Sequence, residues 1–385
     1  MLTHLYRKLQ GKIQSYRLSR PVTLFPKGKA VGNVLLSYIV DPFHRLEDDE
    51  SFINHANRWE CLQMAKTYVE LGFQVDVIAW NDYQYKPSKS YCYCIDVHNN
   101  LERLAPLLNK DCIKILHITG AHWLFQNQAE YTRLEQLKQR RATVLLPRRI
   151  VVPSLGIEHA DIATALGNDF TLSTFSYSRK PIHKIPGSTT TLFSKPSDKN
   201  YTVCRNRFLW LGSNGMVHKG LDLVLEAFVK LPDCFLTICG PVENEHDFAQ
   251  AYHHELYETP NIQTFGFVNI KSALFTDIVN NCVAMIYPSC SEGQAGSVLT
   301  CLHAGLIPVC SQESGVDIED FGIPLLTCSV EEIQNAVLAI SKLDASTLSQ
   351  MSLSAWNYAR NKHTRESFAH AYKKFVLTLP SVASL

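Results

Sequence analysis

The chain has 385 residues, which is long for one domain and comfortable for two. Its composition, 46% hydrophobic and 19% charged, is that of a globular protein, and a net charge of +1 gives no indication of nucleic-acid binding. The 12 cysteines are scattered and include no CxxC pair, so no zinc site is expected and reduced thiols in a cytoplasmic protein are the simplest interpretation. No apolar run reaches the roughly 20 residues that a membrane-spanning helix needs.

Basic residues are concentrated in two places. No acidic residue precedes Asp41, although many lysines and arginines do, and a second basic group lies between 138 and 149. These residues are Arg7, Lys8, Lys12, Arg17, Arg20, Lys27, Lys29, Lys138, Arg140, Arg141, Arg148 and Arg149. Each basic residue adds about 1 kcal/mol near an anionic leaflet. One hypothesis is therefore that this half docks on an anionic membrane surface, at its inner face. A solvated face or an N-terminal arm would account for the same residues.

Hydrophobic periodicity predicts alternating strands and helices in the first half of the chain. Residues 1–30 are interpreted as a basic, poorly structured arm. Strands are predicted at 33–40, 74–80, 91–97, 113–119, 143–146 and 170–177, and helices at 54–71 and 126–141. Elements that alternate in this way form a parallel sheet covered on both faces, and ligands bind beyond the carboxyl ends of its strands.

A second alternating series follows a stretch rich in Pro, Ser, Thr and Lys, residues 181–200. Strands are predicted at 208–211, 234–239, 261–267, 285–288 and 307–310, and helices at 221–231, 244–257, 271–281, 331–343, 348–361 and 365–379. We expect an α/β protein of two Rossmann-like domains that face each other across a cleft. The predicted divisions are an N-terminal domain at 31–190, a linker at 191–205, a C-terminal domain at 206–364 and a final helical segment at 365–385.

The stretch from Ile286 to Val309 reads as strand, turn, short buried helix and strand. Gly296 opens the helix and Gly305 stands at its expected C-terminal position. A helix that begins at a Gly-rich turn points free N–H groups forward, and these suit a phosphate. Glu292 in the same turn can accept hydrogen bonds from sugar hydroxyls instead. Together these features indicate a nucleotide sugar; a common strand–helix–strand unit with a chance Glu and Gly is the alternative.

Lys219 stands in the sequence GSNGMVHKG, after a predicted strand and before a predicted helix. A lysine beside a Gly-containing loop at a helix start is where the charge of a diphosphate is neutralised. A solvated lysine is the alternative, but a cation at a helix N-terminus opposes the helix dipole.

From Phe208 to about Phe375, the chain resembles the C-terminal domain of the retaining glycosyltransferases of family 4, group 1, which have the GT-B fold. The matching elements are Leu211-Gly212, Lys219, Pro288-Ser289, Glu292, Pro308-Val309 and Ser314-Gly315. Ser213 stands where an arginine that contacts phosphate is usual, and Thr300 stands where the family has a second glutamate. The N-terminal half fits only as a generic companion domain.

The resemblance implies a role for each matching residue. Glu292 would be catalytic and bond the donor sugar, while Lys219 and the N–H groups near Gly296 and Ser297 would hold the diphosphate. The remaining expected donor-binding residues are Gly212, Ser213, Gly215, Gly293 and Thr300. Loss of one charged hydrogen bond at Thr300 would cost about 1.5–3 kcal/mol of nucleotide affinity. Lys195, Arg205 and His218 are the candidate replacements for the missing arginine.

The acceptor side is predicted at the end of the strand at 113–119. His117 and His122 flank this strand end, where an imidazole could bind an acceptor or serve as a base. His122 is the candidate catalytic residue and His117 a candidate acceptor ligand; structural histidines are the alternative. Arg58, near the start of the first helix, is a candidate for contacting acceptor or phosphate, and a surface ion pair is equally open.

The expected function is metal-independent, hexosyltransferase-like transfer of a sugar, with retention, from a nucleoside diphosphate sugar to a hydroxyl acceptor. The acceptor would be a sugar, a lipid-linked molecule or another hydroxyl compound, in polysaccharide or glycolipid assembly. No cofactor and no nucleic acid are expected, and the location is cytoplasmic, at most peripheral at the membrane. The resemblance also implies that the last helix crosses back to the N-terminal domain. An epimerase or hydrolase of nucleotide sugars and a non-catalytic binding protein are the alternatives.

Overall fold

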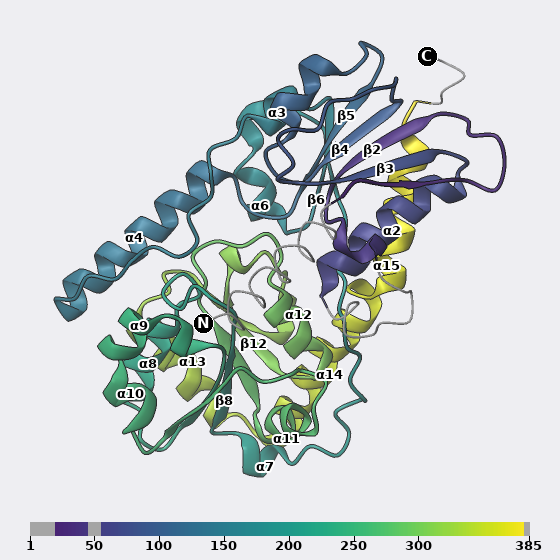
Figure 1. Ribbon diagram of the computed structural model, residues 1–385. Coiled ribbons are helices and arrows are strands. Elements are labelled where there is room, and N and C mark those ends of the chain that lie inside the picture. Colours follow the sequence, from purple (N-terminus) through teal and green to yellow (C-terminus); the bar gives the residue numbers. More distant parts are fainter. Residues whose placement is uncertain (1–19, 45–54, 381–385) are drawn as a thin grey trace, which may run out of the picture.

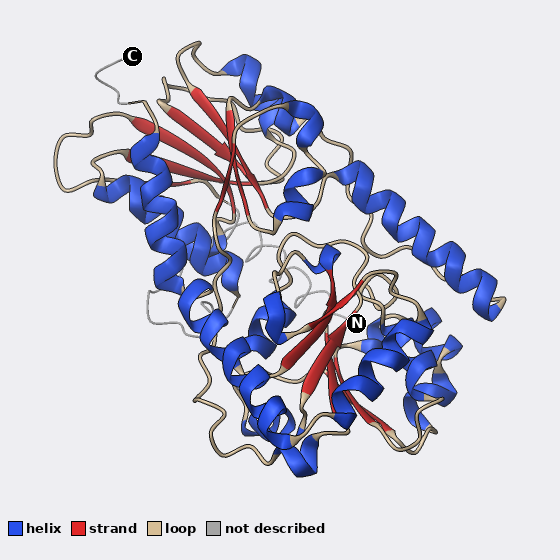
Figure 2. Cartoon of the chain, turned by 180° about the vertical axis from the view of Figure 1, so that it is seen from behind, coloured by secondary structure: helices blue, strands red, loops and turns tan. Residues whose placement is uncertain are grey.

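The computed structural model describes residues 20–44 and 55–380, which form two α/β domains, each around its own sheet (Figure 1). Most of the predicted N-terminal arm and the predicted helix start at 54 lie outside the described residues. The view from behind shows the two sheets separately, each with helices packed around it (Figure 2). The predicted α/β class with two parallel-sheet domains is confirmed.

The N-terminal sheet has seven strands in the order β1-β3-β2-β4-β5-β6-β7. β1 pairs antiparallel with β3, and the other neighbours pair in parallel. The strands are β1 (Val22–Leu24), β2 (Asn33–Tyr38), β3 (Gln74–Ala79), β4 (Tyr93–Asp96), β5 (Ile113–Ile118), β6 (Ile162–Ala165) and β7 (Ile182–Lys184). The helices are α2 (Ala56–Glu70), α3 (Leu101–Leu104), α4 (Trp123–Arg141), α5 (Gly156–His159) and α6 (Asp169–Ser173), with short 3-10 turns at Asp41–His44, Ala105–Leu107 and Ser176–Ser178.

Two predicted strands of this domain are wrong. Residues 143–146 form a strap rather than a strand, and the amide of Leu146 donates to Asp247 of the other domain (3.0 Å). Residues 170–177 form α6 and a 3-10 turn, because the side chain of Asn168 caps the helix. The sheet uses β6 and β7 in their place. The short sequence of β6, IATA, is buried along most of its length and therefore lacks the alternation that marks a strand.

The C-terminal sheet has six parallel strands in the order β10-β9-β8-β11-β12-β13. They are β8 (Arg207–Leu211), β9 (Phe235–Cys239), β10 (Ile262–Gly266), β11 (Ala284–Tyr287), β12 (Ile307–Ser311) and β13 (Ile323–Leu325). The helices are α7 (Tyr201–Cys204), α8 (Leu221–Phe228), α9 (His246–Ala251), α10 (His253–Tyr257), α11 (Ala273–Asn281), α12 (Gly296–His303), α13 (Val330–Lys342), α14 (Ala345–Lys362) and α15 (Arg365–Thr378), with 3-10 turns at Val242–Asn244, Gln312–Ser314 and Glu319–Phe321. The helix predicted at 244–257 is thus divided, and β13 was not predicted.

The final helix, α15, packs against α2 of the N-terminal domain (Figure 1). Phe368, Tyr372 and Phe375 are buried in one hydrophobic cluster with the N-terminal strands. The ring of Phe368 also meets Trp59 of α2 edge to face, with 5.9 Å between ring centroids. The chain therefore passes between the domains twice, once before α7 and once at α15.

Helix α4 joins the domains a third time, because it extends from the N-terminal domain along the C-terminal one (Figure 1). Its Leu137 is buried within the C-terminal hydrophobic cluster. Ion pairs fix its end and the strap that follows: Arg140 with Asp222 and Glu226, Arg141 with Glu255, and Arg148 with Asp247. These three arginines form ion pairs inside the molecule, and membrane docking by the basic residues stays a hypothesis.

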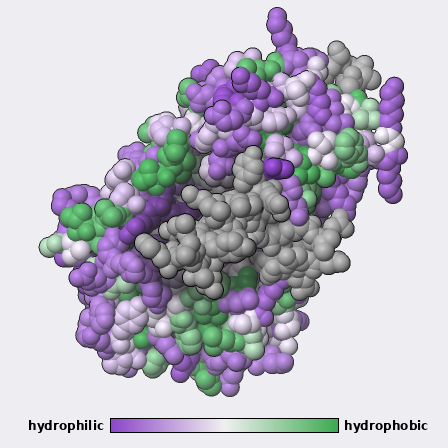
Figure 3. Space-filling model, in the orientation of Figure 1, coloured by the Kyte–Doolittle hydropathy of each residue, from purple (hydrophilic) through white to green (hydrophobic). Residues whose placement is uncertain are grey.

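On the face shown in Figure 3, hydrophobic residues form separate groups on a largely hydrophilic surface. Among the helices of residues 20–44 and 55–380, none combines the length and the apolar character needed to cross a bilayer.

Candidate functional site

The candidate site lies at the carboxyl ends of β8 and β11, where the strand order of the C-terminal sheet reverses. The chain builds outward from β8 through β9 to β10, and then returns to place β11 on the other side of β8. Open parallel sheets bind ligands in the crevice at such a reversal. The loop after β8 carries Lys219, and the loop after β11 carries Glu292.

Glu292 and Lys219 are brought together, as an ion pair between Lys219 Nζ and Glu292 Oε1. The two side chains are only 13% and 4% exposed, respectively. The same carboxylate oxygen accepts a hydrogen bond from the hydroxyl of Tyr287 (2.9 Å) and lies 3.4 Å from Ser289 Oγ. Each member of the buried pair thus compensates the charge of the other.

The neighbouring cations fix the charge of this cluster. Burial alone would raise the pKa of Glu292, but the charges of Lys219, His218 and Arg149 lower this pKa to about 2. Glu292 is therefore ionised at neutral pH. Burial and the nearby Glu292 carboxylate raise the pKa of Tyr287 well above its ordinary value, so its phenol remains a hydrogen-bond donor.

Helix α12 begins beside this cluster with an uncapped N-terminus. Its N-cap residue, Ala295, makes no side-chain cap, and the described residues offer no acceptor to the amides of Gly296 and Ser297. Gly296 is exposed, and a Cβ at this position would meet no atom within 4 Å. Two open amides at the positive end of a helix dipole can bind an anion.

The glycines of the loop after β8 allow neighbouring groups to pack closely. A Cβ on Gly212 would lie 2.3 Å from the indole of Trp210, so the glycine makes room for that ring. Gly215 has a φ of +97°, and its amide donates to the buried carboxylate of Glu245. The amide of Gly215 is thus already satisfied within the protein, and a role in donor binding stays a prediction.

The other predicted donor residues also have specific surroundings. Gly293 lets the domains touch, because a Cβ there would lie 2.1 Å from the carbonyl oxygen of Thr119. Its own carbonyl accepts a hydrogen bond from Thr171 Oγ1 (3.1 Å). Ser213 is exposed at the loop surface. The hydroxyl of Thr300 donates to the carbonyl of Gly296 within α12 (2.8 Å), so it has no second proton to offer a ribose.

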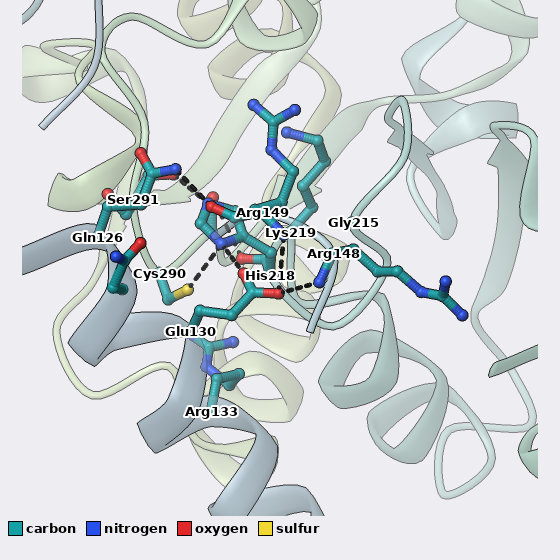
Figure 4. A network of polar contacts seen from close by, with 12 residues as sticks. Gln126, Glu130, Arg133, Arg148, Arg149, Gly215, His218, Lys219, Cys290 and Ser291 are labelled. Atoms are coloured by element: carbon teal, nitrogen blue, oxygen red, sulfur yellow. Dashed lines mark hydrogen bonds and ion pairs between the residues drawn. The ribbon is translucent and has the colours of Figure 1, made fainter. Parts of the chain in front are cut away.

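His218, named from the sequence only as a possible substitute for the missing arginine, bridges the domains at this site (Figure 4). Its Nδ1 contacts the carboxylate of Glu130 from α4, and its Nε2 contacts the carbonyl oxygen of Ser291. Because both ring nitrogens face acceptors, both must carry protons, and the ring is a cation. Burial lowers the pKa of His218, but hydrogen bonds with Cys290 and Glu130 raise it to about 9.

Arg149, seen in the sequence only as part of a basic cluster, is held at the domain boundary. Its amide donates to Glu130 (3.1 Å), and its carbonyl accepts from the side chain of Gln126 (2.7 Å). The side chain passes closely over Gly215, where a Cβ would lie 2.7 Å from Arg149 Cγ. Its guanidinium extends in the same direction as the Lys219 side chain (Figure 4).

A pocket of about 590 Å³ opens in the N-terminal domain next to Arg149. It is lined by aromatic residues, among them Trp80 and Trp123, and by the loop after β5. A cavity of this size with mostly apolar walls and a few polar groups suits a small organic ligand. In the described part of the chain, His, Cys, Asp and Glu side chains nowhere gather in threes as a metal site would require.

His122 lines this pocket, but both of its ring nitrogens are engaged. As the N-cap of α4, it accepts the amide of Leu124 at Nδ1 (3.3 Å). Its Nε2 lies 3.1 Å from the hydroxyl of Tyr177, which itself donates to Glu158 (2.6 Å), so Nε2 must be the donor. The capping role agrees with the structural alternative for His122, and its role as a catalytic base stays a prediction.

The two predicted acceptor residues lie elsewhere. His117 is fully buried on the opposite face of β5, between Tyr38 and Tyr372, with Nδ1 2.7 Å from Thr164 Oγ1. An acceptor in the pocket cannot reach it, so the expected contact is wrong. Arg58 forms an ion pair with Asp41 (3.3 Å), which was the alternative to a role in contacting acceptor or phosphate.

The comparisons with known proteins agree with this geometry. Residues 205–343 match the family model of glycosyl transferases group 1, and the curated proteins give no match. Among solved structures, a sucrose-phosphate synthase from Thermosynechococcus elongatus is similar over 90% of this chain and 98% of its own, with 12% identity and a TM-score of 0.59. Anabaena HepE in complex with UDP and glucose is similar over 90% and 100%, with 12% identity and a TM-score of 0.57.

TarM from S. aureus is similar over 74% of this chain, with 13% identity and a TM-score of 0.51. The chain spans about half the length of TarM, 53%. At these identities the likeness concerns the fold. The chain therefore has the two-domain GT-B fold, and its segment 205–343 carries the sequence pattern of the group 1 glycosyl transferases.

Proposed function

We propose that this protein transfers a sugar from a nucleoside diphosphate sugar to a hydroxyl acceptor. The observation that carries the proposal is the meeting of Lys219, Glu292 and the uncapped start of α12 at the strand-order reversal. A diphosphate would bind Lys219 and the α12 amides. Glu292, relieved of its lysine, would then accept hydrogen bonds from the hydroxyls of the donor sugar.

Stabilisation of the leaving group would supply most of the catalysis. When the bond from the anomeric carbon to the diphosphate oxygen breaks, that oxygen gains negative charge next to Lys219 and the positive end of α12. His218 adds a second fixed cation nearby. These cations support a reaction that proceeds without a metal ion.

The fate of the acceptor proton follows from the same groups. Because the nitrogens of His122 are engaged, the departing diphosphate would take the proton of the acceptor hydroxyl, and the new bond would form on the face from which the diphosphate leaves. This course corresponds to retention, the stereochemistry implied by the resemblance of the segment from Phe208 to about Phe375 to the retaining family.

The pocket in the N-terminal domain is the proposed acceptor site. Its aromatic walls could pack on a sugar ring or on another hydroxyl compound. HepE, whose structure contains UDP and glucose, supports a nucleotide sugar as donor. A role in polysaccharide or glycolipid assembly, in the cytoplasm, agrees with these substrates. Peripheral membrane binding now depends on the basic residues before Asp41, most of which lie outside the described residues.

A screen of UDP-, GDP- and ADP-sugars for donor hydrolysis tests the proposal, with the Glu292→Gln variant measured in parallel. The wild-type protein should release nucleoside diphosphate from one donor class. Glu292→Gln should lose at least about 100-fold, because each charged hydrogen bond to the sugar contributes about 1.5–3 kcal/mol. Release at the wild-type rate by this variant would remove Glu292 from the mechanism.

Product analysis separates the alternatives. An altered donor sugar formed without an acceptor would identify an epimerase, and free sugar that no acceptor can intercept would identify a hydrolase. No turnover and no heat of nucleotide binding would favour a non-catalytic protein. The structural reason would be that the exposed Ser213 and the internally bonded Thr300 replace the family's arginine and second glutamate.

A further inference from the structure

Arg149 differs from the other arginines of the segment 140–149, because each of those forms an ion pair. In residues 20–44 and 55–380, its guanidinium has no hydrogen-bond or ion-pair partner, and its Nε is fully buried. Its neighbour Arg148 pairs with Asp247, and Arg140 and Arg141 pair with acids of α8 and α10. Buried polar groups are normally bonded, so the buried, unbonded Nε of this half-buried side chain makes Arg149 a candidate contact for a ligand.

Three cations act on Glu292: Lys219, His218 and Arg149. Lys219 pairs with Glu292, and the protonated His218 pairs with Glu130. Arg149 has no ion-pair partner among the described residues, so its guanidinium is available to an anion.

The position of Arg149 is set before any ligand arrives. Glu130 and Gln126 form hydrogen bonds with its backbone. Its side chain passes close to Gly215, which has no side chain to obstruct it. Figure 4 shows its side chain and that of Lys219 extending in the same direction, one from each domain. The backbone and the start of the side chain are thus held in place, and the planar fork of the guanidinium fits two phosphate oxygens at once.

We propose that Arg149 binds the diphosphate of the donor from the N-terminal domain. It takes the place of the arginine that the C-terminal domain lacks at Ser213, so cations from both domains hold the diphosphate. This inference rests on the proposed function, because it names a further residue of the same donor site.

Titration calorimetry of Arg149→Gln tests the inference. The probes are UDP, GDP and ADP, each compared with its own nucleoside. For the nucleoside diphosphate that the wild-type protein binds, Arg149→Gln should weaken affinity about tenfold to a hundredfold, the range of one charge-assisted hydrogen bond. Affinity for the nucleoside should stay the same, because it has no phosphate. Arg149→Lys should restore part of the loss.

Arg148→Gln is the matched control, since it removes the same charge from the adjacent residue and its side chain points away to Asp247. Its affinity for the nucleoside diphosphate should stay within about twofold of wild type. Equal affinities of wild type and Arg149→Gln, or equal losses for both variants, would overturn the inference and leave the proposed function standing. A wild-type protein that binds none of the three diphosphates would overturn both.

Discussion

At the scale of single residues, the ion pair between Lys219 and Glu292 explains how two charged side chains can stay buried when no ligand is bound. Each is costly to bury alone, and a buried pair that loses one partner is destabilised by roughly 3–5 kcal/mol. An arriving diphosphate can take over the lysine while sugar hydroxyls take over the carboxylate. Binding then exchanges one set of partners for another, and neither charge is left unpaired.

The protonated His218 predicts a loss of stability at alkaline pH. Its folded pKa, about 9, lies above the ordinary value of 6.5, so its contribution is complete below pH 6.5 and is lost as the pH rises towards 9. A shift of this size corresponds to about 3 kcal/mol. Denaturant unfolding at a series of pH values between 6 and 9 should show this decrease.

The control for this prediction is Glu130→Gln, which removes the carboxylate beside the imidazole. The variant should be less stable at pH 6 but should depend less on pH, because the folded pKa of His218 falls. A wild-type protein whose unfolding free energy is the same at pH 6.5 and 9 would show that His218 is not held as a cation.

The sequence alone could predict part of this site. Glu292 and Lys219 belong to local patterns of strand, glycine-containing turn and helix, and such patterns are read within a short window. Arg149 and Glu130 belong to no such pattern. Glu130 reaches His218 across 88 positions, a contact that depends on where α4 lies against the other domain. The contact expected for His117 failed because a strand end does not reveal which face of the sheet a side chain occupies, and neither does it reveal that His122 caps α4.

At the scale of elements, α4 connects the two domains. The side chain of Asp222 is fully buried; its ion-pair partner is Arg140, and the charge of Arg133 also acts on it. Arg140→Gln should therefore lower the free energy of unfolding by about 3 kcal/mol, because it leaves a buried carboxylate unpaired. Chemical denaturation followed by circular dichroism measures this change.

Lys138→Gln is the comparison variant, on the same helix and with the same loss of charge. Lys138 and its partner Glu135 are each 53% exposed, so this change should cost less than about 0.5 kcal/mol. If the two variants prove equally stable, α4 does not fasten the domains in the way described.

The three edge strands that escaped prediction share a physical cause. The strands β1, β7 and β13 have three residues each and stand at sheet edges, where a run is too short to show a period. Long elements with a clear apolar face, such as α8 and α13, were placed within a few residues of their ends. Tertiary contacts with the other domain hold the strap at 143–146 in place, and a local sequence pattern does not predict such contacts.

At the scale of the whole molecule, the domains meet tightly where the donor is proposed to bind. The loops at Thr119 and Gly293 are in direct contact, and Asn168 donates to the carbonyl of Gln312 across the same boundary (3.0 Å). The two domain crossings and α4 hold this arrangement together. Under the proposed function, contacts of this kind would help to exclude water from the reacting bond.

A crystal structure of the protein with the nucleoside diphosphate selected by the donor screen tests the central claim most directly. The account predicts phosphate oxygens about 3 Å from Lys219 Nζ and from the first amides of α12, with the Lys219–Glu292 ion pair opened. A nucleotide bound away from the ends of β8 and β11, with that ion pair intact, would contradict it.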